Sequence, residues 1–400
     1  MSGWATVSLG EIFDIARGGS PRPIDAYVTD DPKGINWVMI GDAKEGSKYI
    51  TSTKRRIRSE GAQRSRRVKP GDFLLTNSMS FGKPYIMQTD GCIHDGWLAL
   101  SPRNGNVDPD FFYHLLGSKS LYSEFERRAS GATVKNLNID LVRGVTVPLP
   151  PLPEQRRIAD ILDKADALRA KRRAALKKLD ELTQSIFLDM FGDPATNPKG
   201  WPVKALGDLA SKFSDGPFGS NLKSEHYTDS GVRVVRLQNI GIGEFIDDDA
   251  AYISDDHFAT LKKHECRPGD VLVGTLGDPN LRACIQPTWL TVALNKADCV
   301  QIRPDTHVAN AVFICGLLNQ PSTERMAQNL MLGQTRVRVS MGRLRGLLVP
   351  VPPVKLQREF ESRIAAVEKL RAEQHSARTY VAALFAALQH GAFTGELALT

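Results

Sequence analysis

The chain has 400 residues, 42% of them hydrophobic and 24% charged, which is enough for two or three domains with cores of their own. No apolar run approaches the ~18 residues of a membrane-spanning helix, and the first residues lack the pattern of a signal peptide. We therefore expect an intracellular, cytoplasmic protein without membrane contact. The net charge of +7 is compatible with a nucleic-acid partner but does not by itself predict one.

Motifs of catalysis and metal binding are missing from the sequence. The five cysteines form no CxxC pair and the eight histidines have no metal-ligand spacing, so we expect buried, reduced thiols and no metal site. A P-loop, a GxGxxG turn after a strand, HExxH and GxSxG are likewise absent. We predict no catalytic residue and no activity of this chain alone.

The first unit, residues 1–146, alternates short apolar runs with loops. In chain order we predict a short element at Val7–Ile15, a turn-rich loop at Gly18–Pro23 and a buried strand at Ile35–Ile40. These are followed by a basic stretch at Lys54–Lys69, a second strand at Phe73–Leu75 and one helix at Asp110–Ser130. Pro70-Gly71-Asp72 forms the turn into the second strand. The basic stretch is compatible with a solvated face and equally with phosphate contacts.

A long helix is predicted after the proline run that starts at Val147. Pro148, Pro150, Pro151 and Pro153 keep that run extended, and a helix can begin at Glu154. No Gly or Pro follows until Gly192, so at 1.5 Å per residue the helix 154–191 spans roughly 57 Å. Its length exceeds the diameter of a small domain.

The apolar side chains of this helix repeat every seven residues, which is typical of a coiled-coil seam. The first line of the seam consists of Ile158, Ala165, Arg172, Leu179 and Ile186. We place Ile161, Leu168, Ala175 and Leu182 on a second line beside it. Such a seam needs a partner helix.

The partner lies in the same chain, in residues 349–400. VPLPP at 147–151 recurs as VPVPP at 349–353, an offset of 202 residues that also relates the two seams. The second seam consists of Phe360, Val367, Gln374, Val381 and Leu388. Residues 192–348 repeat the plan of 1–146 with different loops, so we infer an internal duplication.

Connectivity predicts how the two helices run. The second unit begins about ten residues after the first helix and leads directly into the second one. If the ends of that unit lie close together, the helices are antiparallel, with the polar Arg172 and Gln374 near a pseudo-twofold axis.

Several short motifs together resemble the specificity subunits of type I restriction–modification enzymes over essentially the full chain. They are the GGSP loop at Gly18–Pro21, the two PGD turns, Gly131-Ala132-Thr133, VPLPPLPEQRRIA from Val147, FGDPATNPKGW from Phe191 and AFTGEL from Ala392. The second copy departs from the pattern, because Lys355 and Leu356 stand where the first has Pro153 and Glu154.

The resemblance implies an α+β fold, in which two duplicated mixed α/β target recognition domains (1–146 and 192–348) are joined by long antiparallel coiled-coil helices (147–191 and 349–400). It implies that each domain reads one half of a bipartite, asymmetric site in double-stranded DNA. The helices would set the gap and dock two methyltransferase (M) subunits, which methylate adenine. S-adenosylmethionine, ATP and Mg would belong to the M subunits and to restriction (R) subunits, with no cofactor on this chain.

Polar and basic loop residues are the candidates for DNA contact, because such side chains read base edges and bind phosphates. In the first domain they are Ser20, Arg22, Arg55, Arg64, Ser78, Ser80, Lys83, Lys135 and Asn136. In the second they are Ser220, Lys223, Gln238, Asn239, Thr275, Asn280, Arg282, Gln334, Arg336 and Arg338. Two other readings stay open: a coiled-coil adaptor that binds only protein, and an enzyme in its own right.

Overall fold

The structure is a computed structural model that describes residues 4–44, 46–77, 82–129, 136–277, 279–328, 331–332 and 338–396. The chain divides into two compact units: unit 1 comprises residues 1–172 and 377–400, and unit 2 comprises residues 173–376. The division falls inside the two long helices, α6 (Leu152–Phe191) and α11 (Val354–Thr394). Each unit therefore contains one half of each long helix.

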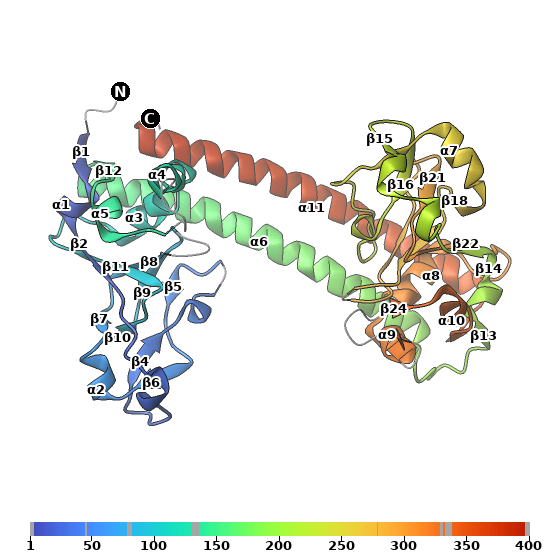
Figure 1. The fold of residues 1–400 in the computed structure, drawn as a ribbon, viewed down its shortest axis with the longest axis horizontal. Helices are drawn as coiled ribbons and strands as arrows, with labels where there is room; N and C mark the ends of the chain where they lie inside the picture. The colour runs from blue at the N-terminus through green and yellow to red at the C-terminus, as the bar shows by residue number, and fades with distance from the viewer. Residues whose placement is uncertain are drawn as a thin grey trace. The chain divides into compact units, whose positions relative to one another are not determined.

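Unit 1 has two five-stranded sheets and a two-stranded ribbon (Figure 1). The first sheet has the order β2-β11-β8-β9-β5, and its strands are Phe13–Arg17, Trp97–Pro102, Phe73–Thr76, Pro84–Met87 and Tyr49–Ile50. The second has the order β3-β6-β4-β10-β7, with strands Val28–Thr29, Arg55–Ile57, Ile35–Val38, Gly91–Ile93 and Arg66–Val68. The ribbon pairs β1 (Ala5–Ser8) with β12 (Thr146–Leu149), which includes the first residues of the proline run.

Unit 2 repeats this order of strands, except that the described part of its first sheet has four strands and no counterpart of β5. Its first sheet has the order β14-β22-β19-β20, with strands Ala210–Ser214, Cys299–Pro304, Val271–Gly274 and Ala283–Ile285. Its second sheet has the order β15-β17-β16-β21-β18, with strands Tyr227–Thr228, Tyr252–Ile253, Val232–Val235, Ala293–Asn295 and Glu265–Cys266. β13 (Val203–Ala205) pairs with β25 (Leu348–Pro350) as β1 pairs with β12. The described part of unit 2 also contains a short ribbon, β23-β24 (Met331–Leu332 and Arg338–Val339). The duplicated α+β fold predicted from the sequence is confirmed.

Four of the five short α-helices described in unit 1, all but the first, have α-helical counterparts in unit 2. Unit 1 contains α1 (Leu9–Ile12), α2 (Ser59–Ala62), α3 (Pro109–Leu116), α4 (Lys119–Ala129) and α5 (Ile139–Arg143). Unit 2 contains α7 (Asp255–Thr260), α8 (Ala311–Leu318), α9 (Pro321–Ala327) and α10 (Met341–Arg345). The single helix predicted at Asp110–Ser130 is wrong: it breaks at Gly117-Ser118, where the Leu121 amide donates to Ser118 Oγ at 3.2 Å and starts α4 anew.

A buried glutamine joins each proline run to its unit. Gln155 accepts from the Asp108 amide at 2.9 Å and donates to the carbonyls of Pro150 and Asn106 at 2.8 and 2.9 Å. In the second copy, 202 residues later, Gln357 makes the same bonds to Asn310, Pro352 and Val308 at 3.0, 2.8 and 3.1 Å. Both side chains are almost fully buried, so each fixes where a long helix begins.

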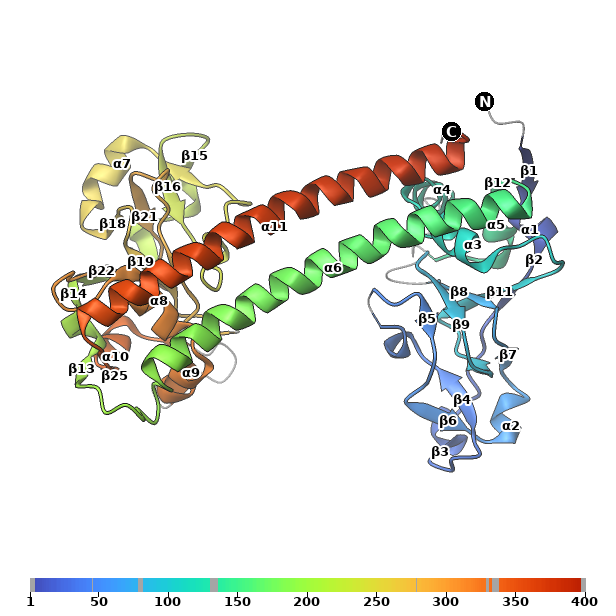
Figure 2. The same cartoon turned by 180° about the vertical axis from the view of Figure 1, so that it is seen from behind.

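Opposite ends of α6 and α11 pack together in each unit (Figure 2). In unit 1 the buried Ile158, near the start of α6, shares a core with Ala392, near the end of α11. In unit 2 Phe187, near the end of α6, packs on Phe360, near the start of α11, with ring centroids 5.6 Å apart. The antiparallel direction predicted from the connectivity is confirmed within each unit.

The five cysteines are buried and free, as predicted. Burial raises the pKa of the Cys299 and Cys315 thiols to about 12, so both remain protonated at neutral pH. Within the described ranges, no helix combines the length and the apolar character needed to cross a membrane.

Candidate DNA interface

Four loops of unit 1 meet at one edge of the sheet β2-β11-β8-β9. β2 ends at this edge and antiparallel β11 begins there, since Arg17 pairs with Leu98. β8 ends and β9 begins at the same edge, since Leu75 pairs with Pro84. We give the name reading edge 1 to the described residues of these loops, which are 18–23, 77, 82–83, 94–96 and 136–138.

Close backbone packing holds reading edge 1 together. A Cβ on Gly18 would lie 1.9 Å from the His94 carbonyl oxygen, so only glycine fits at this point of the GGSP loop. Asn77 donates from Nδ2 to the Asp95 carbonyl at 2.7 Å, and its own carbonyl accepts from the Leu137 amide at 2.9 Å. These bonds tie all four loops to one another.

A carboxylate stands at the centre of reading edge 1. Ser20 Oγ donates to Asp95 Oδ1 at 2.7 Å, and this hydrogen bond is the main reason why the pKa of Asp95 lies below its usual range. Asp95 is therefore ionised at neutral pH and can accept from the amino group of a cytosine or an adenine.

Reading edge 2, in unit 2, is built in the same way. A Cβ on Gly216 would lie 2.1 Å from the Lys296 carbonyl carbon, and the Thr275 carbonyl accepts from the Val339 amide at 3.0 Å. A cavity of about 300 Å³ borders Thr275 and Arg338. The Arg338 guanidinium lies 6.0 Å from the Phe218 ring centroid and 3.6 Å from Asp298 Oδ1.

Many of the predicted contact residues are exposed at or near these loops. The exposed side chains are Arg22, Arg55, Arg64, Lys83 and Asn136 in unit 1 and Ser220, Lys223, Gln238 and Arg338 in unit 2, while Ser20 is half-buried. Arg64 lies over the Tyr27 ring at 5.7 Å, which holds its guanidinium near the surface. Ser78, Ser80, Lys135, Gln334 and Arg336 lie outside the described residues.

Four candidates have internal roles in the structure. Asn239, Thr275 and Asn280 are at most 4% exposed. Asn239 donates to the carbonyls of Ile246 and Asp249, and Thr275 donates to the Asp298 carbonyl. Arg282 donates to four backbone carbonyls, those of Ile240, Leu276, Pro279 and Leu237, at 2.8 to 3.2 Å. These bonds support the loops, so we expect base contacts to come from the exposed neighbours.

Sequence reasoning missed two exposed aromatic residues of unit 2. Phe218, 44% exposed, follows Gly216 as Ser20 follows Gly18, so aligning the two glycines would have identified it. Trp289 is 57% exposed and packs edge-on against Phe245, with centroids 5.7 Å apart. No pattern in the sequence distinguishes Trp289 from a core residue.

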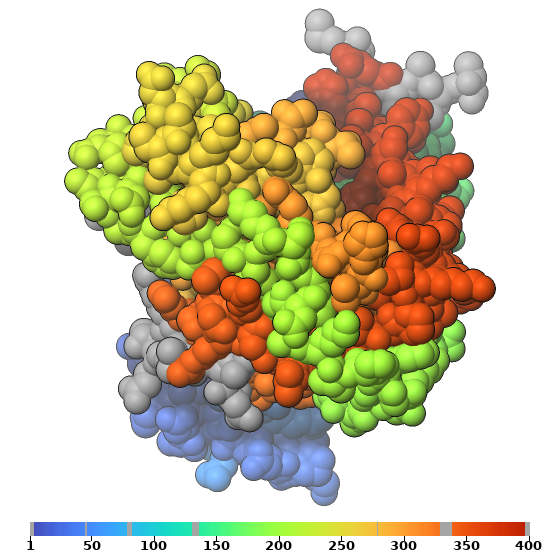
Figure 3. All heavy atoms as spheres, turned by 90° about the vertical axis from the view of Figure 1, so that its right-hand side faces the viewer, coloured from blue at the N-terminus to red at the C-terminus, as the bar shows by residue number. Residues whose placement is uncertain are grey.

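The second sheets of the two units carry opposite charge. Residues 24–69 of unit 1 contain 11 Lys and Arg against 6 Asp and Glu, whereas the equivalent residues 222–267 of unit 2 contain 6 against 9. Figure 3 faces unit 2 and shows this segment, coloured green to yellow, as a continuous part of the surface. Long-range attraction to phosphates would therefore favour unit 1.

The structure places the predicted seam residues at different depths. Ile158, Phe360, Val367 and Val381 are buried, and the others are half-buried: Ala165, Arg172, Leu179, Ile186, Gln374 and Leu388. The second line proposed beside the seam is wrong, because Leu168 and Leu182 are 38% and 43% exposed. The leucines that are buried are instead Leu162 and Leu176, which directly follow Ile161 and Ala175 of that line.

The exposed line is itself duplicated. Leu168 and Leu182 correspond at the 202-residue offset to Leu370 and Leu384, which are 48% and 41% exposed. Unit 1 thus carries Leu168 and Leu384, and unit 2 carries Leu370 and Leu182. We name these four residues the leucine stripe. The stripe therefore gives each unit two exposed leucines, one from each long helix.

A metal ion would need several ligand side chains placed close together among the described residues. No group of three or more His, Cys, Asp or Glu is placed to hold a metal ion there. The histidine and carboxylate cluster around His114 serves to join the recognition domain to α6, as described below.

Comparison with known proteins shows which proteins this chain is similar to. Residues 1–178 match the family model for the type I restriction modification DNA specificity domain. A solved structure titled as the structural basis of complex assembly and conformational transition of the type I R-M system covers 98% of this chain and of its own, with a TM-score of 0.61 and 18% identity. The S subunit of M. genitalium gives 0.51 at 15% identity, covering 98% of this chain and 96% of its own.

Curated relatives carry the same name. The type I restriction enzyme MjaIX specificity subunit of Methanocaldococcus jannaschii is 26% identical over 61% of this chain and 60% of its own length, so the match spans less than two thirds of that relative. The EcoBI specificity subunit of Escherichia coli is 22% identical over 98% of this chain and 86% of its own. Residues 1–178 thus resemble a DNA specificity domain, and the chain as a whole is similar to proteins named as type I restriction enzyme specificity subunits.

Proposed function

We propose that reading edges 1 and 2 each recognise one half of a bipartite, asymmetric site in double-stranded DNA. The observation that carries this proposal is the duplication of one scaffold with different loop chemistry. The same strand order and the same glycine contact recur in both units. The exposed side chains differ, with Ser20 replaced by Phe218 and Arg22 by Ser220. Two related surfaces of different chemistry would read two different half-sites.

The two half-sites would be bound with different balances of forces. In unit 1, Arg55, Arg64 and their basic neighbours would bind phosphates and supply most of the salt-dependent affinity. In unit 2, Gln238 and Arg338 would contact base edges, and Phe218 would pack on a sugar or a thymine methyl group. Gln238 is exposed, and it donates to Asp249 Oδ2 at 2.7 Å, a contact that a base could replace.

The helix pair would set the gap between the half-sites and dock the M subunits. The leucine stripe offers one exposed leucine from each long helix in each unit, which fits two copies of one partner. An M subunit with an apolar helical face would bury these leucines. S-adenosylmethionine, ATP and Mg would reside on the M and R subunits.

DNA recognition is tested by sequencing the methylated adenines of a host with and without this chain. The proposal predicts a motif of two short, different halves separated by an unread gap, and the motif disappears when the chain is absent. Binding of the reconstituted complex to that motif should weaken steeply with salt. A contiguous or palindromic motif, or methylation that does not depend on the chain, would refute the proposal.

Docking is tested with Leu168→Glu and Leu370→Glu, which change equivalent residues of the two units. Each should weaken binding of one M subunit at least tenfold, and together they should abolish the complex. Lys178→Glu, at an exposed position of α6 outside the stripe, is the control. Unaltered assembly of the double variant would show that the M subunits bind elsewhere.

A further inference from the structure

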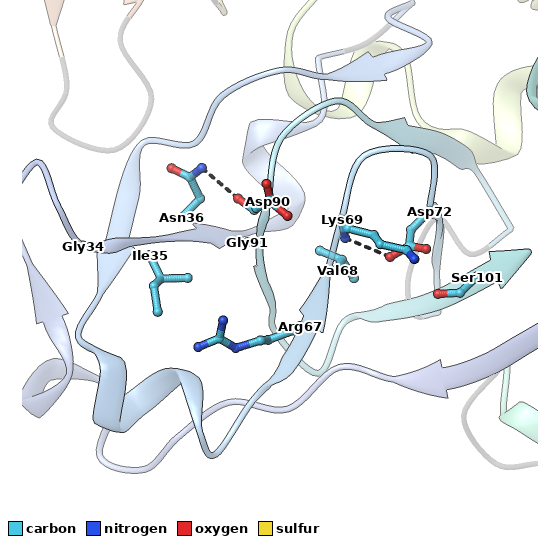
Figure 4. Close-up of a pocket in the computed structure, with 10 residues that line it drawn as sticks. All are labelled: Gly34, Ile35, Asn36, Arg67, Val68, Lys69, Asp72, Asp90, Gly91 and Ser101. Atoms are coloured by element: carbon cyan, nitrogen blue, oxygen red, sulfur yellow. Dashed lines mark hydrogen bonds between the residues drawn. The ribbon is translucent and has the colours of Figure 1, made fainter.

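A pocket of about 500 Å³ lies in unit 1 at the edge of the second sheet that faces away from reading edge 1 (Figure 4). β4 and β10 begin at this edge and antiparallel β7 ends there, whereas their other ends lead to the loops of the reading edge. The lining includes Asn36, Lys69, Asp72, Asp90 and Ser101. The pocket is therefore separate from the proposed DNA-reading surface.

The carboxylate of Asp72 is buried at this pocket with one oxygen unsatisfied. Asp72 is 2% exposed, and its Oδ2 accepts from the Lys69 amide at 2.8 Å. Its Oδ1 is buried and has no hydrogen-bond partner in the part of the chain that the structure describes. A buried carboxylate oxygen without a donor is costly, so this atom indicates that a ligand completes the site.

Unit 2 shows which chemistry the same carboxylate binds. Asp270 occupies the position of Asp72 in the second Pro-Gly-Asp turn. The Arg303 guanidinium binds it through two bonds, Nε to Oδ1 and Nη2 to Oδ2, both of 2.8 Å. Gln301 Nε2 donates to the same carboxylate at 2.5 Å. Asp270 is thus fully satisfied by a bidentate guanidinium and an amide.

The strand register shows what unit 1 has in place of these side chains. In unit 2, Val271 pairs with Ile302 and Leu272 with Gln301; in unit 1, Phe73 pairs with Leu100 and Leu74 with Ala99. Ala99 is therefore equivalent to Gln301, and Ser101 to Arg303. Two long polar side chains are replaced by short ones, which leaves a hollow and removes the cation from the aspartate.

Two cations, Arg67 and Lys69, also line the hollow, but within the described residues neither forms an ion pair with Asp72, so this carboxylate is open to an organic cation. Asp90 adds a second carboxylate, and Ser101 adds a hydroxyl that can accept. Arg67 extends from β7 toward Ile35 and away from Asp72, so it does not take the place of Arg303 (Figure 4). The described residues offer no group of three metal ligands, which argues against a metal ion.

We propose that this pocket binds a guanidinium group on Asp72, from outside the chain, in the position that the Arg303 side chain occupies on Asp270. The guanidinium comes either from a small molecule or from an arginine side chain of a partner subunit. The proposal rests on the duplication and is independent of how the reading edges recognise DNA.

The first test is a calorimetric or NMR titration of the full chain with N-acetyl-L-arginine methylamide. We expect saturable binding with a dissociation constant in the millimolar range, because a ligand with so few atoms gains little binding free energy. The citrulline analogue, which has the same shape without the charge, should bind at least tenfold more weakly. Asp72→Asn should weaken binding of the arginine probe at least tenfold, while Asp30→Asn, an exposed control, should leave it unchanged. Absence of binding at 100 mM, or full binding to Asp72→Asn, would overturn the proposal.

The second test fills the pocket from within. Ser101→Arg restores the arrangement of unit 2, so it should abolish probe binding and raise the melting temperature by about 2–4 °C. Ser101→Met, which fills space without a donor, should not raise it. Ser101→Arg that melts lower than the native chain and still binds the probe would overturn the proposal.

The source of the guanidinium is decided in the complex with M subunits. If a partner arginine occupies the pocket, the complex will not take up the probe, and Asp72→Asn will weaken assembly at least tenfold. If the ligand is a small molecule, the complex binds the probe as the free chain does and assembly is unchanged. Both results support the guanidinium site. Assembly that is weakened by Asp30→Asn as strongly as by Asp72→Asn would instead show a general charge effect and overturn the partner assignment.

Discussion

In unit 1 a polar cluster joins the recognition domain to the helix pair. His114 Nε2 on α3 lies 2.6 Å from Asp163 Oδ1 on α6, and Lys48 Nζ lies 2.9 Å from the same oxygen and 2.5 Å from Asp110. From α11, Gln389 donates to the His114 carbonyl at 3.2 Å. The side chain of His114 is only 3% exposed. The contact between α3 and the long helices is thus made by hydrogen bonds and ion pairs.

In unit 2 an aromatic cluster occupies the equivalent place. At the 202-residue offset, Gly316 replaces His114 and Phe187 replaces Gln389. The Phe187 ring packs within 5.0 to 6.0 Å of the rings of Phe191, Phe313 and Phe360. A Cβ on Gly316 would lie 3.1 Å from Phe360 and 3.2 Å from Phe187, so the glycine makes room for these rings. The equivalent contact between the short helices and the long helices is therefore made by charged and polar groups in unit 1 and by apolar packing in unit 2.

This difference between the polar cluster and the aromatic cluster predicts which substitutions and which changes of pH each unit tolerates. Apolar burial is insensitive to pH and salt, whereas buried ion pairs depend on the protonation of every member. The following changes test this comparison, from the largest expected effect to the smallest.

Phe187→Ala should destabilise unit 2 by about 3–5 kcal/mol, because it leaves a cavity among three other rings. Gln389→Ala, the equivalent change in unit 1, should cost about 1 kcal/mol or less, since one hydrogen bond is lost. Hydrogen exchange of peptides from α8 and α3 measures the two units separately. Equal losses at both positions would contradict the comparison.

Gln155→Met and Gln357→Met should each cost about 2–3 kcal/mol, because each leaves buried backbone groups without partners. Here the two copies make the same bonds, so the two losses should agree within about 0.5 kcal/mol. Exchange of the amides at Asp108 and Asn310 is the readout. A large loss in only one copy would show that the shared geometry does not have a shared energetic role.

Acidification from pH 7.5 to 5.5 should destabilise the α3–α6 contact of unit 1. Burial lowers the pKa of His114 despite the pull of Asp163, so the folded state keeps it neutral while the unfolded chain takes up a proton near pH 6.5. Stability is therefore lost as the pH falls below about 6.5. Burial alone would raise the pKa of Asp163, but bonds from Lys48 and His114 outweigh it and lower that pKa, so this carboxylate stays charged over the interval.

The pH experiment needs a comparison with His114→Gln, because burial also lowers the pKa values of His94 and His264. Those two histidines contribute equally in the native chain and in the variant, so the difference between the two proteins reports His114. Exchange of α3 peptides should depend on pH less steeply in the variant than in the native chain. An identical slope would exclude His114 as the source.

The charge difference between the second sheets predicts a smaller effect on DNA binding. Arg55→Ala and Arg64→Ala together should reduce the salt slope of binding by about 2, one unit for each phosphate contact. Lys223→Ala and Lys262→Ala, exposed positions of the acidic segment of unit 2, should reduce it by less than about 1. Equal reductions would mean that local contacts, rather than the charge of the segment, decide phosphate binding.

The helices and the duplication were predictable because they depend on spacing along the chain. The proline runs, the 38 residues without Gly or Pro after the first run and the 202-residue offset between the two long helices are all visible in the sequence. The second seam line failed because one residue rotates a side chain by about 100° on a helix, and leucines occur on both faces of α6. Leu168 and Leu182 follow the heptad as well as Leu162 and Leu176 do, and only packing separates them.

The contact residues were harder to predict because loop side chains acquire their roles from tertiary neighbours. Arg282 and Arg338 are both arginines in turn-rich segments, yet Arg282 binds four carbonyls and Arg338 is exposed. The polar cluster around His114 combines Lys48, which precedes β5, with residues of α3, α6 and α11, and Lys48 and Asp163 are 115 positions apart. Periodicity cannot reveal such a site.

The most direct test of the account is the methylation motif produced by a complex that carries Arg338→Ala in reading edge 2. The account predicts that one half of the motif becomes degenerate, while the other half and the gap between them keep their native sequence and length. Degeneracy in both halves, or a native motif despite weakened DNA binding, would contradict the claim that each unit reads its own half-site.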